Sequence, residues 1–186
     1  MKIILGSNSP RRKEILSKIG LSFDIRVSTA KEYSEKVNPV DYAKELSLKK
    51  SKDIEIFEDE LLITADTIVA FENEILGKPK NEIEAFNMLK KLSGKKHVVI
   101  TGITFRTLKE IYTIDDTTEV YFHELSDEII KYYIKNYKPL DKAGSYGIQD
   151  FGGTFIEKIN GDYYNVMGLP LNKVFWYLYK KGVFNG

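Results

Sequence analysis

The stretch that most constrains the fold is "ELLITADTIVAF", residues 60–71, in which eight of the twelve side chains are apolar and do not alternate with polar ones. A strand with one face in water alternates apolar and polar residues, so a strand this apolar must be covered on both faces, as in the middle of a sheet. Helical patterns precede and follow it, at residues 41–54 and 82–94. These segments predict a mixed α/β fold in which helices flank a central β-sheet.

The remaining segments continue this mixture. Apolar and β-branched runs predict further strands at residues 2–6, 23–28, 97–106 and 110–125, and amphipathic runs predict helices at residues 10–19, 126–137 and 172–182. Ser126 is expected to cap the second of these helices. The apolar stripe of the 82–94 helix is expected to comprise Ile83, Phe86, Leu89 and Leu92. Asn160-Gly161, between two β-rich runs, predicts a hairpin. No repeat or linker interrupts the sequence, which predicts a single domain over residues 1–186.

The composition excludes several classes of function. Lys and Arg total 28 against 27 acidic residues, so the net charge of +1 gives no reason to expect nucleic acid or an anionic membrane as a partner. The absence of cysteine excludes disulfides, thiolate metal sites and a cysteine nucleophile, and it is compatible with a reducing cytosol. The apolar run near Met1 is too short for a signal peptide, and no stretch approaches the ~20 apolar residues of a transmembrane helix. A cytoplasmic protein is expected.

The segment "LGSNSPRRKEIL", residues 5–16, breaks a local rule. It predicts the end of a strand, a tight turn and a helix that begins with Ser9 as the capping residue and Pro10 at the first helical position. First turns of helices favour acidic residues because the macrodipole leaves partial positive charge there. This first turn carries three cations instead, Arg11, Arg12 and Lys13.

Two interpretations of this basic turn are open. Ser7, Ser9 and the backbone N–H groups of a helix start form a cradle for an anion, and Arg11 and Arg12 would bind a polyphosphate bidentately. The plain alternative is a solvated basic helix end. The segment is neither a P-loop nor a G-x-G-x-x-G fingerprint, which disfavours those classes of nucleotide-binding protein.

Asp66 breaks a second rule, because it lies within the apolar 60–71 strand. Burying a carboxylate costs several kcal/mol unless it is paired, hydrogen-bonded or bound to a metal. The strand supplies no partner, since the next cation along the sequence is Lys78. Asp66 is therefore a candidate catalytic or metal-linked residue; the alternative is an aspartate at an exposed strand end, capped by backbone N–H groups.

Lys50 and Gln149 are weaker candidates. Lys50 shares a helix face with Ala43, Leu46 and Ile54, so it either extends its ammonium to the edge of the apolar face or meets a buried anion. Gln149 lies among glycines in "GSYGIQDFGG", and its amide presents a donor and an acceptor suited to the edge of a base. The isolated histidines His97 and His123 are expected to be ordinary strand residues.

With these residues in place, the chain resembles the Maf family of nucleoside triphosphate pyrophosphatases. The resemblance runs from end to end through "LGSNSPRRKEIL", "LSLKKSK", "TADTIV", "LGKP", "MLKKLSGKKHVVITG", "KPLDKAGSYGIQ" and "KINGDYYNVMGLPL". It implies an elongated two-lobed domain of the Maf and ITPase-like type, in which a mixed sheet is flanked by helices and a cleft separates the lobes. It also implies hydrolysis of the bond between the α- and β-phosphates of a nucleotide, with a divalent metal.

The resemblance also implies roles for single residues. Asp66 would be the proton acceptor, or a metal-linked base that activates water. Glu32 and Asp66 would hold the metal, Mg²⁺ or Mn²⁺. The triphosphate would be held by four cations: Arg11, Arg12, Lys50 and Lys78. Positions tied to base selection are matched by Arg11, Thr67 and Gln149.

The "AGSYGIQ" segment resembles the subgroup that acts on dTTP and UTP, and modified pyrimidine nucleotides are possible further substrates. Two positions depart from the family: Asp150 replaces the glycine usual after the glutamine, and Lys31 replaces an acidic neighbour of Glu32. Two alternatives stay open. One is another triphosphate such as 7-methyl-GTP; the other is a nucleotide-binding regulator of cell division and septum formation with little turnover. A homodimer is expected by resemblance alone.

Overall fold

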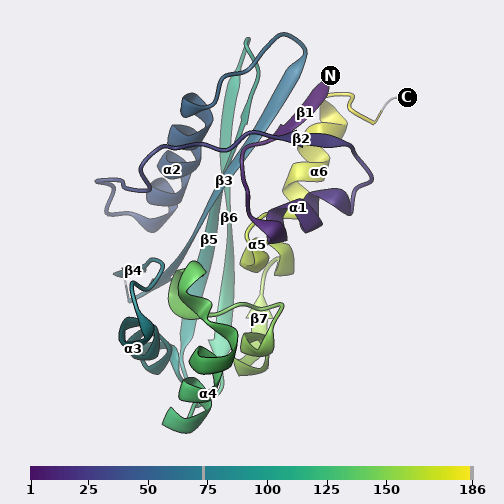
Figure 1. Ribbon diagram of the computed structural model, residues 1–186. Helices are drawn as coiled ribbons and strands as arrows, with labels where there is room; N and C mark the ends of the chain where they lie inside the picture. Colours follow the sequence, from purple (N-terminus) through teal and green to yellow (C-terminus); the bar gives the residue numbers. More distant parts are fainter. Residues whose placement is uncertain (73, 185–186) are drawn as a thin grey trace. The chain divides into compact units, whose positions relative to one another are not determined.

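The computed structural model describes residues 1–72 and 74–184 (Figure 1). The chain forms two compact units, each assembled from separate parts of the sequence. Unit 1 comprises Met1–Thr67, Thr101–Asp116 and Gly168–Gly186. Unit 2 comprises Ile68–Ile100 and Thr117–Met167. The chain therefore passes between the units several times.

A seven-stranded mixed sheet is present in the described part of the chain, with the order β2-β1-β3-β5-β6-β7 and with β4 paired to β3. Strand β1 is parallel to β2 and to β3, whereas β4 is antiparallel to β3 and β7 to β6. The strands are β1 (Lys2–Leu5), β2 (Phe23–Ile25), β3 (Glu60–Phe71), β4 (Glu74–Leu76), β5 (Lys96–Arg106), β6 (Ile111–Phe122) and β7 (Ile156–Asn160).

Strand β3 occupies the interior position that its sequence predicted. It has β1 and β5 as neighbours, and every residue of it is buried except Thr67, which is half-buried. The predicted mixed α/β fold with a central sheet and flanking helices is confirmed. The cleft between two lobes stays a prediction.

Unit 1 contains the helices α1 (Pro10–Ser17), α2 (Pro39–Asp53) and α6 (Leu171–Lys180). The side chain of Asn38 begins α2 by accepting the N–H groups of Val40 and Asp41 at 2.9 and 3.2 Å. At Gly102 of β5, an ideal Cβ atom would lie 2.3 Å from the carbonyl oxygen of Ala43. The backbone of α2 therefore packs directly against β5, at a distance that only glycine permits.

Unit 2 contains α3 (Glu82–Leu92), α4 (Asp127–Tyr137) and α5 (Tyr163–Met167), together with the short 3₁₀ helices η1 (Pro139–Asp141), η2 (Ala143–Ser145) and η3 (Phe151–Phe155). Its core gathers Leu89, Leu92, Ile130, Tyr133 and Phe155, all of which are almost fully buried. Ser126 begins α4 by accepting the N–H of Ile129 at 3.3 Å, as its position predicted.

Two local predictions are wrong. Ile83 is 75% exposed, because α3 buries Ala85, Leu89 and Leu92 and Ile83 lies on the opposite side of the helix. Asn160-Gly161 forms no hairpin, because β7 pairs with β6 and the chain then enters α5.

Tertiary contacts explain the missing hairpin. The Thr118 hydroxyl accepts the N–H of Asp162 and donates to its carbonyl oxygen, both at 3.0 Å. The Asp162 carboxylate accepts the N–H of Tyr164 at 2.7 Å, which favours a helix start at this point. These bonds override the local preference of an Asn-Gly pair.

Candidate functional site

The candidate site of unit 1 begins where β1 ends beside β3. The strands are parallel with Leu5 opposite Ile63, so residues after β1 lie level with the last part of β3 in this unit. An ideal Cβ atom at Gly6 would lie 2.4 Å from Cγ2 of Thr64, so the chain leaves β1 through a position that only glycine can occupy. This edge is where polar side chains of α/β sheets gather.

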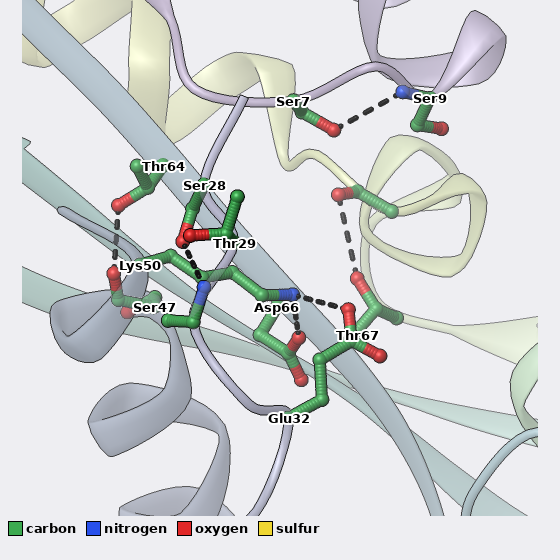
Figure 2. Close-up of polar contacts among 12 residues, drawn as sticks. Ser7, Ser9, Ser28, Thr29, Glu32, Ser47, Lys50, Thr64, Asp66 and Thr67 are labelled. Carbon is green, nitrogen blue, oxygen red and sulfur yellow. Dashed lines mark hydrogen bonds and ion pairs between the residues drawn. The ribbon is translucent and has the colours of Figure 1, made fainter. Parts of the chain in front are cut away.

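Asp66 forms an ion pair with Lys50 at this edge. Figure 2 shows the Lys50 ammonium directed at two carboxylates: it donates to Oδ1 of Asp66 at 2.5 Å and to Oε1 of Glu32 at 2.8 Å. The side chains of Lys50 and Asp66 are 13% and 10% exposed, whereas that of Glu32 is 47% exposed. Of the two interpretations of Lys50, the meeting with a buried anion is correct. Of the two for Asp66, the exposed strand end is wrong.

The loop that carries Glu32 is fixed by Asp53, the last residue of α2. One oxygen of Asp53 accepts the Ser28 hydroxyl at 2.8 Å, the N–H of Thr29 at 2.7 Å and the N–H of Ala30 at 3.1 Å. These bonds, from Ser28 first and then from Thr29, hold the pKa of Asp53 below its ordinary value. Because both Lys50 and Asp53 lie on α2, this helix positions the cation and the loop together.

Arg12 forms a second cluster. Its guanidinium donates to the carbonyl oxygen of Gly168 at 2.8 Å, to the Thr67 hydroxyl at 3.1 Å and to the Ser7 hydroxyl at 3.4 Å. The hydroxyls of Thr67 and Thr101 are 2.9 Å apart. A guanidinium carries five N–H donors, so these three contacts leave others for a ligand.

Burial lowers the pKa of Arg12 from its ordinary value, while the negative charges of Asp66 and Glu32 raise it in part. An arginine side chain nevertheless stays charged at neutral pH. The carboxylates of Asp66 and Glu32, which pair with Lys50, therefore also raise the pKa of Arg12. The Lys50 ion pairs and the Arg12 cluster are thus coupled electrostatically.

The start of α1 differs from its predicted capping. Ser9 occupies the capping position, but within the described residues its side chain makes no capping hydrogen bond; its N–H donates to the Ser7 hydroxyl at 3.2 Å instead. Arg11 is half-buried beside Arg12, and Lys13 donates to Oδ1 of Asn8 at 2.7 Å. A helix start with no capping side chain and with two arginines fits an anion.

Lys78 and Gln149 belong to unit 2. Lys78 is exposed after β4, and the neighbouring Gly77 carbonyl oxygen accepts the N–H of Gly144 at 3.1 Å. Gln149 is exposed in the turn between η2 and η3. The segment after β4 therefore contacts η2 within unit 2. The roles of Lys78 toward phosphate and of Gln149 toward the base stay predictions.

His97 has the structural role that its isolation predicted. It is 2% exposed, its Nε2 lies 2.8 Å from the hydroxyl of Tyr146, and its ring packs edge-to-face on Phe122. Burial lowers the pKa of His97 to about 4, so the ring is neutral at physiological pH.

Three positioning residues were not predicted from the sequence: Asp53, Thr101 and Gly168. Asp53 had a detectable signal, since an acidic residue at a helix C-terminus opposes the macrodipole. Gly168 has a φ of 115°. The sequence signal for this backbone conformation was the presence of a glycine in "VMGLPL". Thr101 had no signal.

Glu32 and Asp66 fit a hard divalent cation, because their carboxylate oxygens already converge on one positive charge, the Lys50 ammonium. In residues 1–72 and 74–184 no cluster of three or more His, Cys, Asp or Glu side chains is arranged for a metal. Mg²⁺ is commonly bound through one or two protein carboxylates together with phosphate oxygens of a substrate. Two carboxylates beside an anion cradle match that arrangement.

The described part of the chain contains no helix long and apolar enough to cross a membrane. A family model described as Maf-like protein matches residues 2–181. The chain is 45% identical over 186 residues to the dTTP/UTP pyrophosphatase of Thermotoga maritima, covering 98% of this chain and 90% of that protein. It is 48% identical over 182 residues to the dTTP/UTP pyrophosphatase of Clostridium beijerinckii, covering 94% and 96%.

Among solved structures, the Ham1 protein of Staphylococcus aureus is similar in fold. The TM-score is 0.50 and the sequence identity 13%, over 67% of this chain and 73% of that chain. The fold is shared at that level, whereas the family model and the protein relatives cover nearly the whole sequence. The chain therefore belongs to the Maf family.

Proposed function

We propose that the chain is a nucleoside triphosphate pyrophosphatase that hydrolyses dTTP and UTP to the monophosphate and pyrophosphate. The observation that carries the proposal is the buried Asp66 held by Lys50, with Glu32 and Arg12 close by. The relatives that are 45% and 48% identical over almost the whole chain are named for this activity. The reaction class is hydrolysis of a phosphoanhydride.

In the proposed mechanism, Asp66 accepts the proton of the attacking water. A carboxylate oxygen has lone pairs that can accept a proton, which suits Asp66 to the role of general base. Lys50 fixes the position of this carboxylate through the 2.5 Å hydrogen bond. Glu32 and Asp66 would hold a Mg²⁺ or Mn²⁺ ion, which would supply positive charge that offsets the charge of the phosphates.

Substrate binding needs a local cluster of cations, because the whole chain is near neutrality at +1. The proposal assigns the triphosphate to the hydroxyls of Ser7 and Ser9 and to four cations: Arg11, Arg12, Lys50 and Lys78. It assigns base selection to Arg11, Thr67 and Gln149. The hydroxyl of Thr67 is already oriented by Arg12, at 3.1 Å.

A panel of triphosphates with Mg²⁺ or Mn²⁺ tests the proposal. Monophosphate and pyrophosphate are expected from dTTP and UTP, at rates at least ~10-fold above those from purine triphosphates, a difference of about 1.4 kcal/mol in transition-state binding. Equal rates on purines would contradict the pyrimidine assignment, and a preference for 7-methyl-GTP would replace it. Nucleotide binding without pyrophosphate release, with metal present, would favour a regulatory protein of cell division.

Replacing Gln149 by Ala is expected to remove base discrimination more than rate. Loss of one side-chain hydrogen-bonding group in a base site costs about 1 kcal/mol, which is roughly a fivefold change in the ratio of kcat/KM between substrates. Glu157→Ala, at an exposed position of β7 in the same unit, is the matched control. An unchanged substrate profile in Gln149→Ala would argue against its role in base selection.

A cytoplasmic location and a homodimer stay predictions. The absence of cysteine suits a reducing compartment. The substrate itself would be a free nucleotide, with neither nucleic acid nor a membrane as a partner.

A further inference from the structure

A residue proposed to read a base must be held in place. Gln149 is exposed and lies in a stretch with glycines at 144, 147, 152 and 153. A glutamine amide presents an acceptor and a donor side by side, and a flip of the amide group reverses their order. Uracil and cytosine differ in this order, so a loosely placed glutamine would accept both bases.

The Tyr133 hydroxyl joins the two sides of the Gln149 turn. Tyr133 lies on α4 and is fully buried. Its hydroxyl accepts the N–H of Gly147 at 3.0 Å and donates to Oδ1 of Asp150 at 2.9 Å. The same oxygen of Asp150 accepts the N–H of Gly152 at 2.8 Å. One hydroxyl therefore connects a residue before Gln149 with the residue directly after it.

The Tyr133 hydroxyl is an acceptor in one of these hydrogen bonds and the donor in the other. The oxygen of Tyr133 receives a backbone N–H, so its single proton is available for the carboxylate of Asp150, and the two bonds reinforce each other. Burial, and then the charge of Asp150, raises the pKa of Tyr133. The phenol keeps its proton at physiological pH, and the bond to Asp150 is retained.

The packing leaves the turn little freedom. An ideal Cβ atom at Gly147 would lie 2.7 Å from Oδ2 of Asp150, and one at Gly152 would lie 2.9 Å from the Tyr133 hydroxyl. The ring of Tyr133 is itself held edge-to-face against Phe155, with centroids 5.0 Å apart. These glycines therefore allow close approach rather than looseness.

We infer that Tyr133 and Asp150 are positioning residues that fix Gln149 and thereby set base selection. The inference rests on the proposed function and deepens it. It also gives a role to Asp150, which departs from the usual glycine of the family. Its carboxylate accepts the hydrogen bond of the Tyr133 hydroxyl. Neither residue touches the reacting phosphates in this scheme, so both act on selectivity.

The test compares UTP with CTP, which differ in the order of donor and acceptor on the base edge. Tyr133→Phe keeps the ring and removes the hydroxyl. The ratio of kcat/KM for UTP over CTP is expected to fall about 10-fold, which corresponds to 1.4 kcal/mol, with kcat for UTP within about 2-fold of wild type. Tyr137→Phe is the matched control, because that ring stacks on Tyr133 from the same helix and is partly exposed.

Asp150→Ala provides a second route, since it removes the acceptor without touching α4. It is expected to lower the UTP-to-CTP ratio of kcat/KM as well. The double variant is expected to lower this ratio little further, because both changes break the same Tyr133–Asp150 hydrogen bond. If Tyr133→Phe shows a lowered melting temperature and altered circular dichroism, the UTP-to-CTP ratio measured for Asp150→Ala decides whether the inference holds.

The outcomes separate the inference from the proposed function. An unchanged UTP-to-CTP ratio in folded Tyr133→Phe, or in Asp150→Ala where the first variant is misfolded, overturns the inference and leaves the proposed function standing. A wild-type protein that releases no pyrophosphate from any pyrimidine triphosphate overturns the proposed function and the inference with it.

Discussion

Replacing Asp66 by Asn is expected to lower kcat for UTP by about 10³-fold, within the range that general bases contribute. An asparagine amide has nearly the same shape as a carboxylate but accepts no proton and is a weaker ligand for a hard cation. The cations at the start of α1 are untouched, and Lys50 keeps its hydrogen bond to Glu32. Triphosphate binding is therefore expected to stay within about 3-fold of wild type, a change below 1 kcal/mol.

Two measurements check this prediction. Pyrophosphate release gives kcat, and calorimetric titration with a triphosphate analogue that resists cleavage between its α- and β-phosphates gives the dissociation constant. Asp24→Asn is the control, because it removes an exposed carboxylate from the same unit, where Asp24 pairs with Lys2. Near-normal turnover in Asp66→Asn would show that the proposed mechanism is wrong.

Replacing Gly102 by Ala is expected to lower the free energy of unfolding by about 3 kcal/mol, the upper part of the usual range for overpacking. The added methyl group would meet the backbone of α2, 2.3 Å from the Ala43 carbonyl oxygen and 2.6 Å from the Lys44 nitrogen. Backbone atoms cannot rotate away as a flexible side chain can, so the helix must shift. Because α2 also carries Lys50, activity is expected to fall together with stability.

Urea denaturation with a common m-value measures the change in stability. Gly77→Ala is the control, since an ideal Cβ atom at that position has nothing within 4 Å. A Gly102→Ala protein with wild-type stability would mean that α2 is not seated as closely on β5 as the geometry indicates.

The sequence predicted the central elements well, because their signals are local. The apolar run at residues 60–71 coincides with β3, and the capping serine before α4 was correctly placed. Asn160-Gly161 was misinterpreted because the competing bonds come from Thr118, more than a strand's length away in sequence.

For the candidate site, the sequence identified side chains but not their partners. Asp66 and Lys50 each break a local pattern, so each could be found alone. Their pairing depends on α2 resting against β5 at Gly102, which no periodicity encodes. The contact between Arg12 and Gly168 joins residues 156 positions apart, beyond any local signal.

The interleaving of the two units has a consequence for the order in which the protein folds during its synthesis. All residues of unit 2 have been made once Met167 is added, whereas unit 1 still lacks Gly168–Gly186. Arg12 is synthesised before unit 2, whereas the Gly168 carbonyl oxygen that accepts its hydrogen bond is synthesised after unit 2. Since chains emerge from the ribosome N-terminus first, the synthesis of unit 1 is completed after that of unit 2. A nascent chain therefore cannot form the hydrogen bond between Arg12 and Gly168 until all of unit 2 has been synthesised.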